Sequence, residues 1–214
     1  MNRQAEPGRR SDSFPRFHHR WLSWAFFLAV LVVPGPARGS GELDRLYTHG
    51  PGPVEVYIMT DYFCPPCQGI EPYLERALPE MLRQGVKISF VDTPIHLNTP
   101  LYSRYYIFAA AASNTFEQAM KVRNALFDVA RTKSIVTDQE LIQELKARDI
   151  KIKLTDTTPI FNQWRELIAR FKVESTPTCV VVKPGEKDKV YAGGKEIRKG
   201  LDQFRRELSP AGVK

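Results

Sequence analysis

Cysteine is scarce in this chain, with three residues among 214, at Cys64, Cys67 and Cys179. A small fold stapled by disulfides uses more cysteines in a shorter chain, so that class is excluded. Beyond the first 40 residues the only histidines are His49 and His96, which leaves few ligands for a four-coordinate zinc site. A spaced pair of cysteines with one distant thiol indicates redox chemistry or metal binding.

Long hydrophobic runs are also lacking. The longest, Trp21–Val33, has 13 residues, whereas a helix that spans a bilayer needs about 20. An arginine- and histidine-rich stretch precedes the run and small residues follow it, which is the order of a secretory signal. We predict that residues 1–39 are a signal peptide cut near 37–39, or an uncleaved N-terminal anchor. Either makes the protein periplasmic or otherwise exported.

A strong excess of one charge is missing from the body of the chain. The formal net charge is +7, but residues 1–39 hold six arginines and two acids, which leaves +3 on the remainder. A body so near neutrality predicts no nucleic-acid partner. The apolar share of 43% is that of an ordinary globular protein with a core.

The cysteine pair lies between two predicted elements. Residues 40–53 read as a linker or a short lead-in strand, and 54–60 as a strand rich in β-branched residues. The pair follows at once, then a helical pattern that ends at Gly85, then a strand over 86–92. A strand–helix–strand unit of this kind implies a parallel strand pair.

The rest of the chain returns to strands only after a helical stretch. Residues 97–157 show helical spacing and read as an insertion, and a further amphipathic helix covers 160–171. Two strands joined by a turn follow Thr176-Pro177-Thr178, and a last helix covers 196–208. We therefore predict one α/β domain over residues 54–210, with a helical insertion at about 97–157.

A C-x-x-C at the start of a helix has a physical rationale. Free N–H groups and the positive end of the helix dipole stabilise a thiolate there. We assign Cys64 as the exposed nucleophile and Cys67 as the resolving cysteine, cycling through a mixed disulfide. Pro65 and Pro66 lack N–H groups, so the Cys64 thiolate is stabilised only moderately and the couple is more reducing. Phe63, with Tyr62, would form an apolar rim for clients.

Other functions of the pair stay open at this point. The two sulfurs could form a structural disulfide or bind Cu(I) as soft ligands in a metal chaperone. The same groove could serve a non-catalytic module that only binds clients. The direction of electron flow is also open. No cofactor and no metal are expected for the enzyme.

The combined pattern resembles the thioredoxin superfamily. Four features agree in order: a strand, an aromatic residue before Cys64-x-x-Cys67, a helix, and Thr176-Pro177-Thr178 just before a strand. The helical insertion is similar to the exported DsbA-like branch, while Thr60-Asp61 before the pair looks more like the DsbC/DsbG branch. The resemblance implies a thioredoxin-like fold, with a central mixed sheet flanked by helices, and disulfide exchange as the activity.

The resemblance also implies a client site and partners. Pro177 would be cis and lie beside the cysteines, leaving the backbone of Thr176 to pair with an extended client. Phe63, Pro65 and Pro66 would complete the substrate-binding surface. The implied partners are exported proteins with thiols or disulfides, and a redox partner protein that is soluble or membrane-bound. About 14 residues before the first strand cannot hold the dimerisation domain of the isomerase branch, so we expect a monomer.

One position departs from the family pattern, and two further residues have more than one reading. The buried acid six residues before the first cysteine is replaced by Ile58, and Asp61 is the nearer candidate for a proton acceptor. Cys179 lies in an apolar strand, where an inert buried thiol is favoured over a third redox sulfur. His96 either faces the active site or is an ordinary loop or core histidine.

Overall fold

The computed structural model describes residues 43–133 and 135–208, and all of them belong to one compact unit. The predicted signal or anchor, residues 1–39, lies outside the described residues. So do residues 209 and 210 at the end of the predicted domain.

A five-stranded mixed sheet forms the centre of the domain. Its strands are β1 (Thr48–His49), β2 (Glu55–Thr60), β3 (Lys87–Asp92), β4 (Thr178–Val182) and β5 (Lys189–Ala192). They lie in the order β1-β3-β2-β4-β5; β2 and β3 are parallel and the other pairs antiparallel. The sheet begins at Thr48, within the range 40–53, so the short lead-in strand is present there after a 3-10 turn at Asp44–Leu46.

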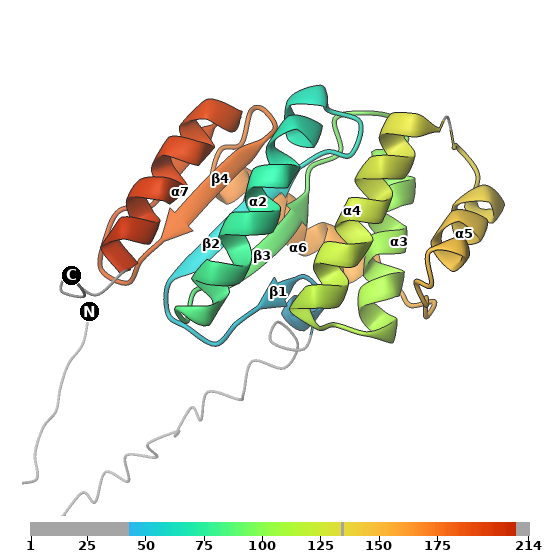
Figure 1. Cartoon of the computed structure of the whole chain (residues 1–214), viewed down its shortest axis with the longest axis horizontal. Coiled ribbons are helices and arrows are strands. Elements are labelled where there is room, and N and C mark those ends of the chain that lie inside the picture. Colours follow the sequence, from blue (N-terminus) through green and yellow to red (C-terminus); the bar gives the residue numbers. More distant parts are fainter. Residues whose placement is uncertain (1–42, 134, 209–214) are drawn as a thin grey trace, which may run out of the picture. The chain divides into compact units, whose positions relative to one another are not determined.

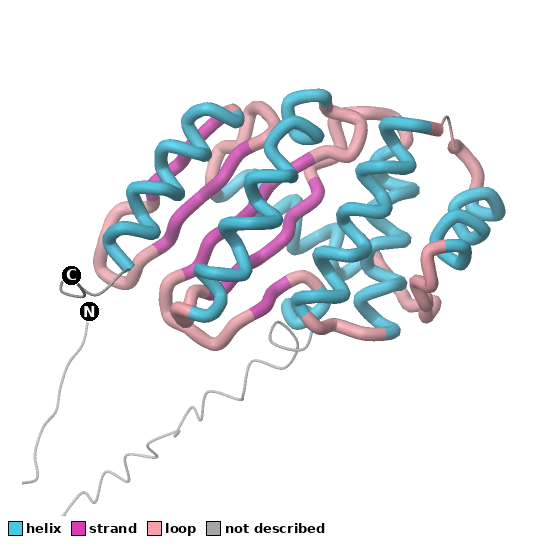
Figure 2. The backbone as a smooth tube through the Cα atoms, in the orientation of Figure 1, coloured by secondary structure: helices cyan, strands magenta, loops and turns pink. Residues whose placement is uncertain are grey.

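Helices cover both faces of this sheet. In Figure 1, α2 (Pro65–Arg83) and α7 (Gly194–Leu208) lie in front of the strands, and α6 (Thr158–Arg170) lies behind them. The tube in Figure 2 shows the same layers, with the strands between the helices. Val56 and Tyr57 are neighbours that point to opposite faces of β2, and both are buried. This double burial is what a sheet covered on both sides produces.

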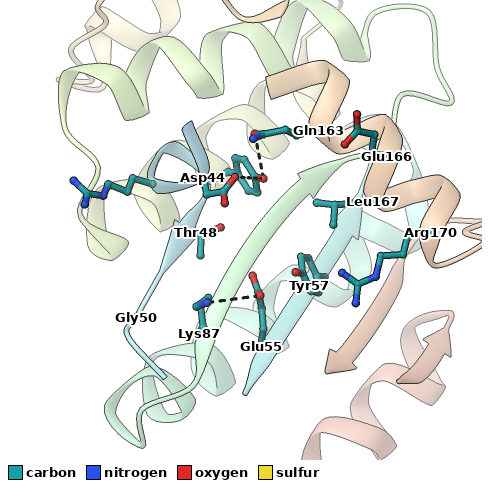
Figure 3. Close-up of a pocket in the computed structure, with 12 residues that line it drawn as sticks. Asp44, Thr48, Gly50, Glu55, Tyr57, Lys87, Gln163, Glu166, Leu167 and Arg170 are labelled. Atoms are coloured by element: carbon teal, nitrogen blue, oxygen red, sulfur yellow. Dashed lines mark hydrogen bonds and ion pairs between the residues drawn. The ribbon is translucent and has the colours of Figure 1, made fainter. Parts of the chain in front are cut away.

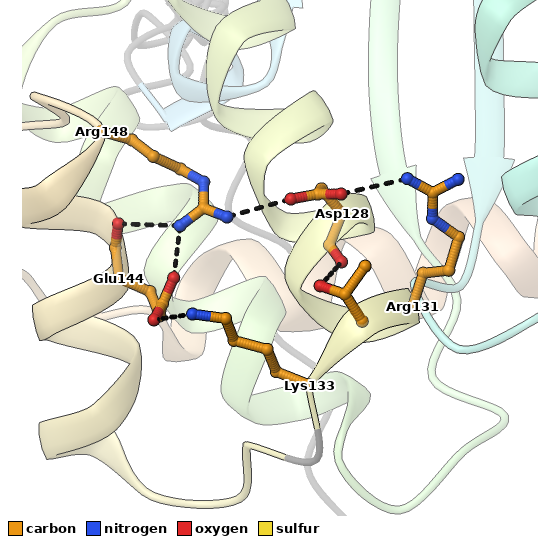
Figure 4. Close-up of polar contacts among 6 residues, drawn as sticks. Asp128, Arg131, Lys133, Glu144 and Arg148 are labelled. Carbon is orange, nitrogen blue, oxygen red and sulfur yellow. Dashed lines mark hydrogen bonds and ion pairs between the residues drawn. The ribbon is translucent and has the colours of Figure 1, made fainter.

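The predicted insertion contains three helices beside the sheet: α3 (Thr99–Ala112), α4 (Phe116–Thr132) and α5 (Asp138–Ala147). Thr115 caps α4 by accepting from Gln118 N, and Thr137 caps α5 by accepting from Glu140 N. A chain of ion pairs joins α4 to α5, as Figure 4 shows. Arg148 pairs with Asp128 at 2.9 Å and with Glu144, which also binds Lys133.

Candidate active site

The backbone places Cys64 at the start of α2. Cys64 is extended (φ −79°, ψ 116°) and is the N-cap, while Pro65 and Pro66 occupy the first two helical positions. Proline suits these positions because their N–H groups have no partner within the helix. The N–H groups of Cys67 and Gln68 donate to the Cys64 carbonyl oxygen at 3.0 and 3.1 Å. The cysteine pair therefore occupies the strand-to-helix junction that the sequence predicts.

The two thiols are free, and they differ in exposure. Cys64 is 7% exposed and Cys67 is fully buried. The expectation that Cys64 is an exposed nucleophile is therefore wrong in degree: the residue is mostly covered, although Cys64 remains the more accessible of the two cysteines. The flanking Pro65 and Pro66 are exposed.

Thr176 and Pro177 lie beside the cysteines. The Thr176–Pro177 peptide bond is cis, and the Cys64 thiol donates to the Thr176 carbonyl oxygen at 3.4 Å. Burial raises the pKa of the Cys67 thiol, and the nearby polar groups of the Thr176 side chain and the Asp61 backbone offset part of that effect. Thr176 therefore borders both cysteines, although it comes more than 100 residues later in the chain.

The aromatic residues before the pair have different surroundings. The half-buried Phe63 ring packs edge-on against Tyr102, with 4.8 Å between ring centroids, and lies 6.4 Å from the ring of His96. Tyr62 is fully buried between Tyr102 and Phe127. Tyr62 is thus a core residue, and its predicted place on the apolar rim is wrong.

The side chain of Asp61 joins two loops. It is fully buried, and one oxygen accepts from Phe63 N at 2.8 Å. The other oxygen accepts from Ile95 N at 2.8 Å and His96 N at 2.9 Å. The His96 ring nitrogen Nδ1 lies 3.1 Å from the first oxygen. These contacts are those of a loop anchor, and His96 lies at the active site rather than in the core.

A buried polar cluster lies directly beneath the cysteine loop, and the sequence analysis missed it. Arg123 of α4 is fully buried and bonds to Glu71 at 2.5 Å and to the Thr60 hydroxyl at 3.2 Å. Burial raises the pKa of Glu71, and it raises the pKa of Asp92 to about 6 although Arg123 opposes the shift. One signal was available: Glu71 lies four residues after Cys67, on the apolar face of the helix.

The third cysteine stands apart from the pair. Cys179 is fully buried in β4, where it is paired in register with Ile58. Burial raises the pKa of its thiol, which disfavours the reactive thiolate. Its position agrees with the inert-thiol alternative.

A separate cavity among the described residues lies away from the cysteine pair. This cavity has a volume of about 560 Å³ and is lined by charged groups of both signs, including Glu55, Lys87 and Arg170 (Figure 3). Glu55 begins β2 whereas Cys64 follows its end, so the cavity is at the opposite end of that strand. Within the described ranges, no group of three or more His, Cys, Asp or Glu residues could hold a metal ion.

Among residues 43–133 and 135–208, no helix has both the length and the apolar character that a membrane span requires.

Comparison with known proteins bears on the fold. No protein-family model and no curated protein matches the chain. ScsC of Proteus mirabilis, in a transitional conformation, matches with a TM-score of 0.61 at 18% identity, over 78% of this chain and 74% of that chain. A periplasmic thioredoxin-like protein from Salmonella enterica serovar Typhimurium matches at 0.58 and 17%, over 78% and 92%. The thiol-disulfide exchange protein alpha-DsbA2 from Wolbachia pipientis matches at 0.55 and 17%, over 75% and 90%. The predicted fold class is confirmed: the chain has a thioredoxin-like fold of the kind found in DsbA and ScsC proteins.

Proposed function

We propose that this protein is a thiol–disulfide oxidoreductase that exchanges disulfides with exported proteins through Cys64 and Cys67. The observation that carries the proposal is the position of Cys64, which caps α2 with its thiol 3.4 Å from the Thr176 carbonyl oxygen and Cys67 one turn further along. The solved structures that share the fold include a protein described as a thiol-disulfide exchange protein. That description supports the proposal by analogy of fold.

In the reductive direction, the chemistry runs in two displacements. The Cys64 thiolate attacks one sulfur of a client disulfide, which forms a mixed disulfide and releases the other client sulfur as a thiolate. Cys67 then loses its proton and attacks Cys64 Sγ, which releases the second client thiolate and leaves the Cys64–Cys67 disulfide. Two electrons pass to the client, and a redox partner protein must return them. The oxidative direction is the reverse of these steps.

The surroundings of the pair suit a client in extended form. The Thr176 backbone borders Cys64, so a client strand can pair with it while its own cysteine reaches the sulfur. Phe63, Pro65 and Pro66 contribute half-buried or exposed apolar surface on the same loop, whereas Pro177 is buried. The export signal predicted over residues 1–39 supports activity in the periplasm or another exported compartment.

The helix start favours a reducing couple. Neither Pro65 nor Pro66 offers an N–H group to a thiolate, and the next two N–H groups are bonded to the Cys64 carbonyl oxygen. A thiolate with fewer donors makes the dithiol form less stable, which lowers the reduction potential. We therefore infer that the protein donates electrons to its clients.

The test is the reduction potential of the Cys64–Cys67 couple in a graded thiol buffer, with Cys179→Ser as the background. We expect a value near the thioredoxin level of about −270 mV. A value near about −120 mV would mean a donor of disulfides and would overturn the inferred direction. If no disulfide forms between the pair, the oxidoreductase proposal fails, and Cu(I) binding by the two sulfurs becomes the next measurement.

A further inference from the structure

The large cavity at the far end of β2 lies on the face of the sheet that α6 covers. Its walls come from the turn before β1, from the starts of β2 and β3, and from one side of α6 (Figure 3). Its volume of about 560 Å³ is in the range of cavities that bind small molecules. Tyr57 of β2 is buried in the wall, and Leu167 of α6 is half-buried beside it. These two side chains give the cavity an apolar surface among polar groups.

Two opposite charges on α6 line this cavity without forming an ion pair with each other. Glu166 and Arg170 are exposed and lie four residues apart, a spacing at which glutamate and arginine can pair. Among the described residues, Glu166 has no ion-pair partner. Arg170 instead approaches Asp188 at 3.9 Å and stacks on the ring of Phe171, 4.7 Å from its centroid. The two charges of α6 therefore remain available at the cavity.

The other walls also carry charges of both signs. Glu55 and Lys87 belong to neighbouring strands and approach each other only to 3.9 Å. Tyr57 lies between Glu55 and Arg170 in Figure 3. Burial raises the pKa of Tyr57, Glu55 adds to this rise, and Arg170 opposes it, so both charged groups act on the phenol. A simple anion would be repelled by the carboxylates and a simple cation by the basic groups. The cavity therefore suits a ligand with one charge of each sign.

We propose that this cavity binds a zwitterionic dipeptide, whose ammonium group pairs with Glu166 and whose carboxylate pairs with Arg170. Residues four apart on a helix have their Cβ atoms about 5–6 Å apart. The two residues of an extended dipeptide span about 7 Å at most, so its charged ends can reach both side chains. The side chains of the dipeptide lie against Leu167 and Tyr57. This site is separate from the cysteine pair, because the two are at opposite ends of β2.

The test compares three probes that share one backbone: alanyl-leucine, its N-acetyl form and its C-terminal amide. The first carries both charges, the second only the carboxylate, and the third only the ammonium group. Titrations of the full-length protein are followed by NMR at the backbone amides of Leu167 and Tyr57. We expect saturable shifts with alanyl-leucine. Each blocked probe should bind about threefold to fivefold more weakly, as expected for the loss of one partly exposed ion pair.

Two substitutions on α6 test the two ends of the ligand separately. Glu166→Gln should weaken the binding of alanyl-leucine but not that of the N-acetyl probe, which has no ammonium group. Arg170→Gln should weaken alanyl-leucine but not the C-terminal amide, which has no carboxylate. Both side chains are exposed, so neither substitution should disturb the fold. Arg165→Gln is the matched control, because Arg165 is an exposed residue of the same helix that does not line the cavity.

The three probes and three variants give outcomes that decide the proposal. Equal affinities for the three probes, or no saturable shift with any of them, would overturn the dipeptide site. A Glu166→Gln variant that weakens the N-acetyl probe as much as alanyl-leucine would overturn the assigned orientation. The Arg165→Gln control should bind alanyl-leucine as the wild type does, and a loss equal to that of Arg170→Gln would show a general charge effect instead of a site.

Discussion

At the scale of single residues, the unequal burial of the two cysteines assigns their order of reaction. Cys64 keeps some exposed area and Cys67 keeps none, so a client meets Cys64 first. In Cys67→Ser the mixed disulfide should form and persist, because no second sulfur is present to resolve it. Mass spectrometry of the trapped adduct checks this. Cys64→Ser should trap nothing, and an adduct at Cys67 in that variant would reverse the assignment.

Replacing Arg123 should lower the free energy of unfolding more than most other single substitutions do. Its guanidinium is buried with Glu71, so Arg123→Met leaves a carboxylate buried without its partner. Losing one member of a buried pair costs about 3–5 kcal/mol, measured as the free energy of unfolding in urea. Replacing both, with Glu71→Gln added, should cost less. Arg131→Met on the exposed side of α4 is the control, at about 0–1 kcal/mol.

His49 should lower the free energy of unfolding at acidic pH. It is buried in β1 between the rings of Phe90 and Phe116, and burial lowers its pKa from 6.5 to about 4. Between these values the unfolded chain binds more protons than the folded one, so stability falls as the pH drops. A shift of this size corresponds to roughly 3 kcal/mol.

The measurement compares His49→Phe with the wild type in urea at pH 7 and pH 4. The wild type should lose about 3 kcal/mol relative to the variant across this range. The quantity to compare is the difference between the two proteins, because Asp92 contributes equally to both. Its pKa is raised to about 6, so its protonation in the folded state increases stability as the pH drops, opposite to the effect of His49. Equal losses in the two proteins would contradict the role of His49.

At the scale of elements, α5 has two kinds of attachment to the domain. Leu141 and Leu145 are buried, whereas the ion pairs of Arg148 with Asp128 and Glu144 are partly exposed. Leu145→Ala should cost about 2–5 kcal/mol through lost burial and a cavity. Arg148→Met should cost about 1 kcal/mol or less, and added salt should shrink that cost.

Urea unfolding of both variants at low and high salt separates the two contributions. A larger loss in Arg148→Met than in Leu145→Ala would show that the ion pairs in Figure 4 dominate the attachment of α5.

Local sequence patterns predict the helices and strands of this chain well. They do not predict the side-chain contacts between segments that are far apart in the sequence. Thr115 and Thr137 cap helices that the spacing of apolar residues predicts. The bond of Asp61 to Ile95 and His96, and that of Arg123 to Glu71, join segments far apart in sequence. The bonds of Asp61 have no local signature. Glu71 on the apolar face of α2 is a local signal of the buried cluster, but it does not identify Arg123 as the partner.

At the scale of the whole molecule, the redox state of the pair is linked to the stability of the fold. A disulfide that resists reduction in the folded protein is one that stabilises the folded state. Because Pro65 and Pro66 give a reduced Cys64 few donors, we expect the oxidised protein to melt at the same temperature as the reduced form or higher. Thermal unfolding of both forms, with Cys179→Ser, checks this. A reduced form that melts several degrees higher would indicate an oxidising couple.

The burial of Arg123 bears on whether the helical insertion can be removed from the domain. The helical insertion looks like a separable addition to a minimal thioredoxin-like core, because it enters after β3 and leaves before α6. Yet α4 supplies the cation that neutralises Glu71 beneath the cysteine loop. A shortened chain that joins β3 directly to α6 would remove that cation together with α4, the helix that packs on α2 at this point. The insertion thus supplies the cation that pairs with Glu71 on the helix of the cysteine pair, and its removal changes the electrostatics next to the candidate site.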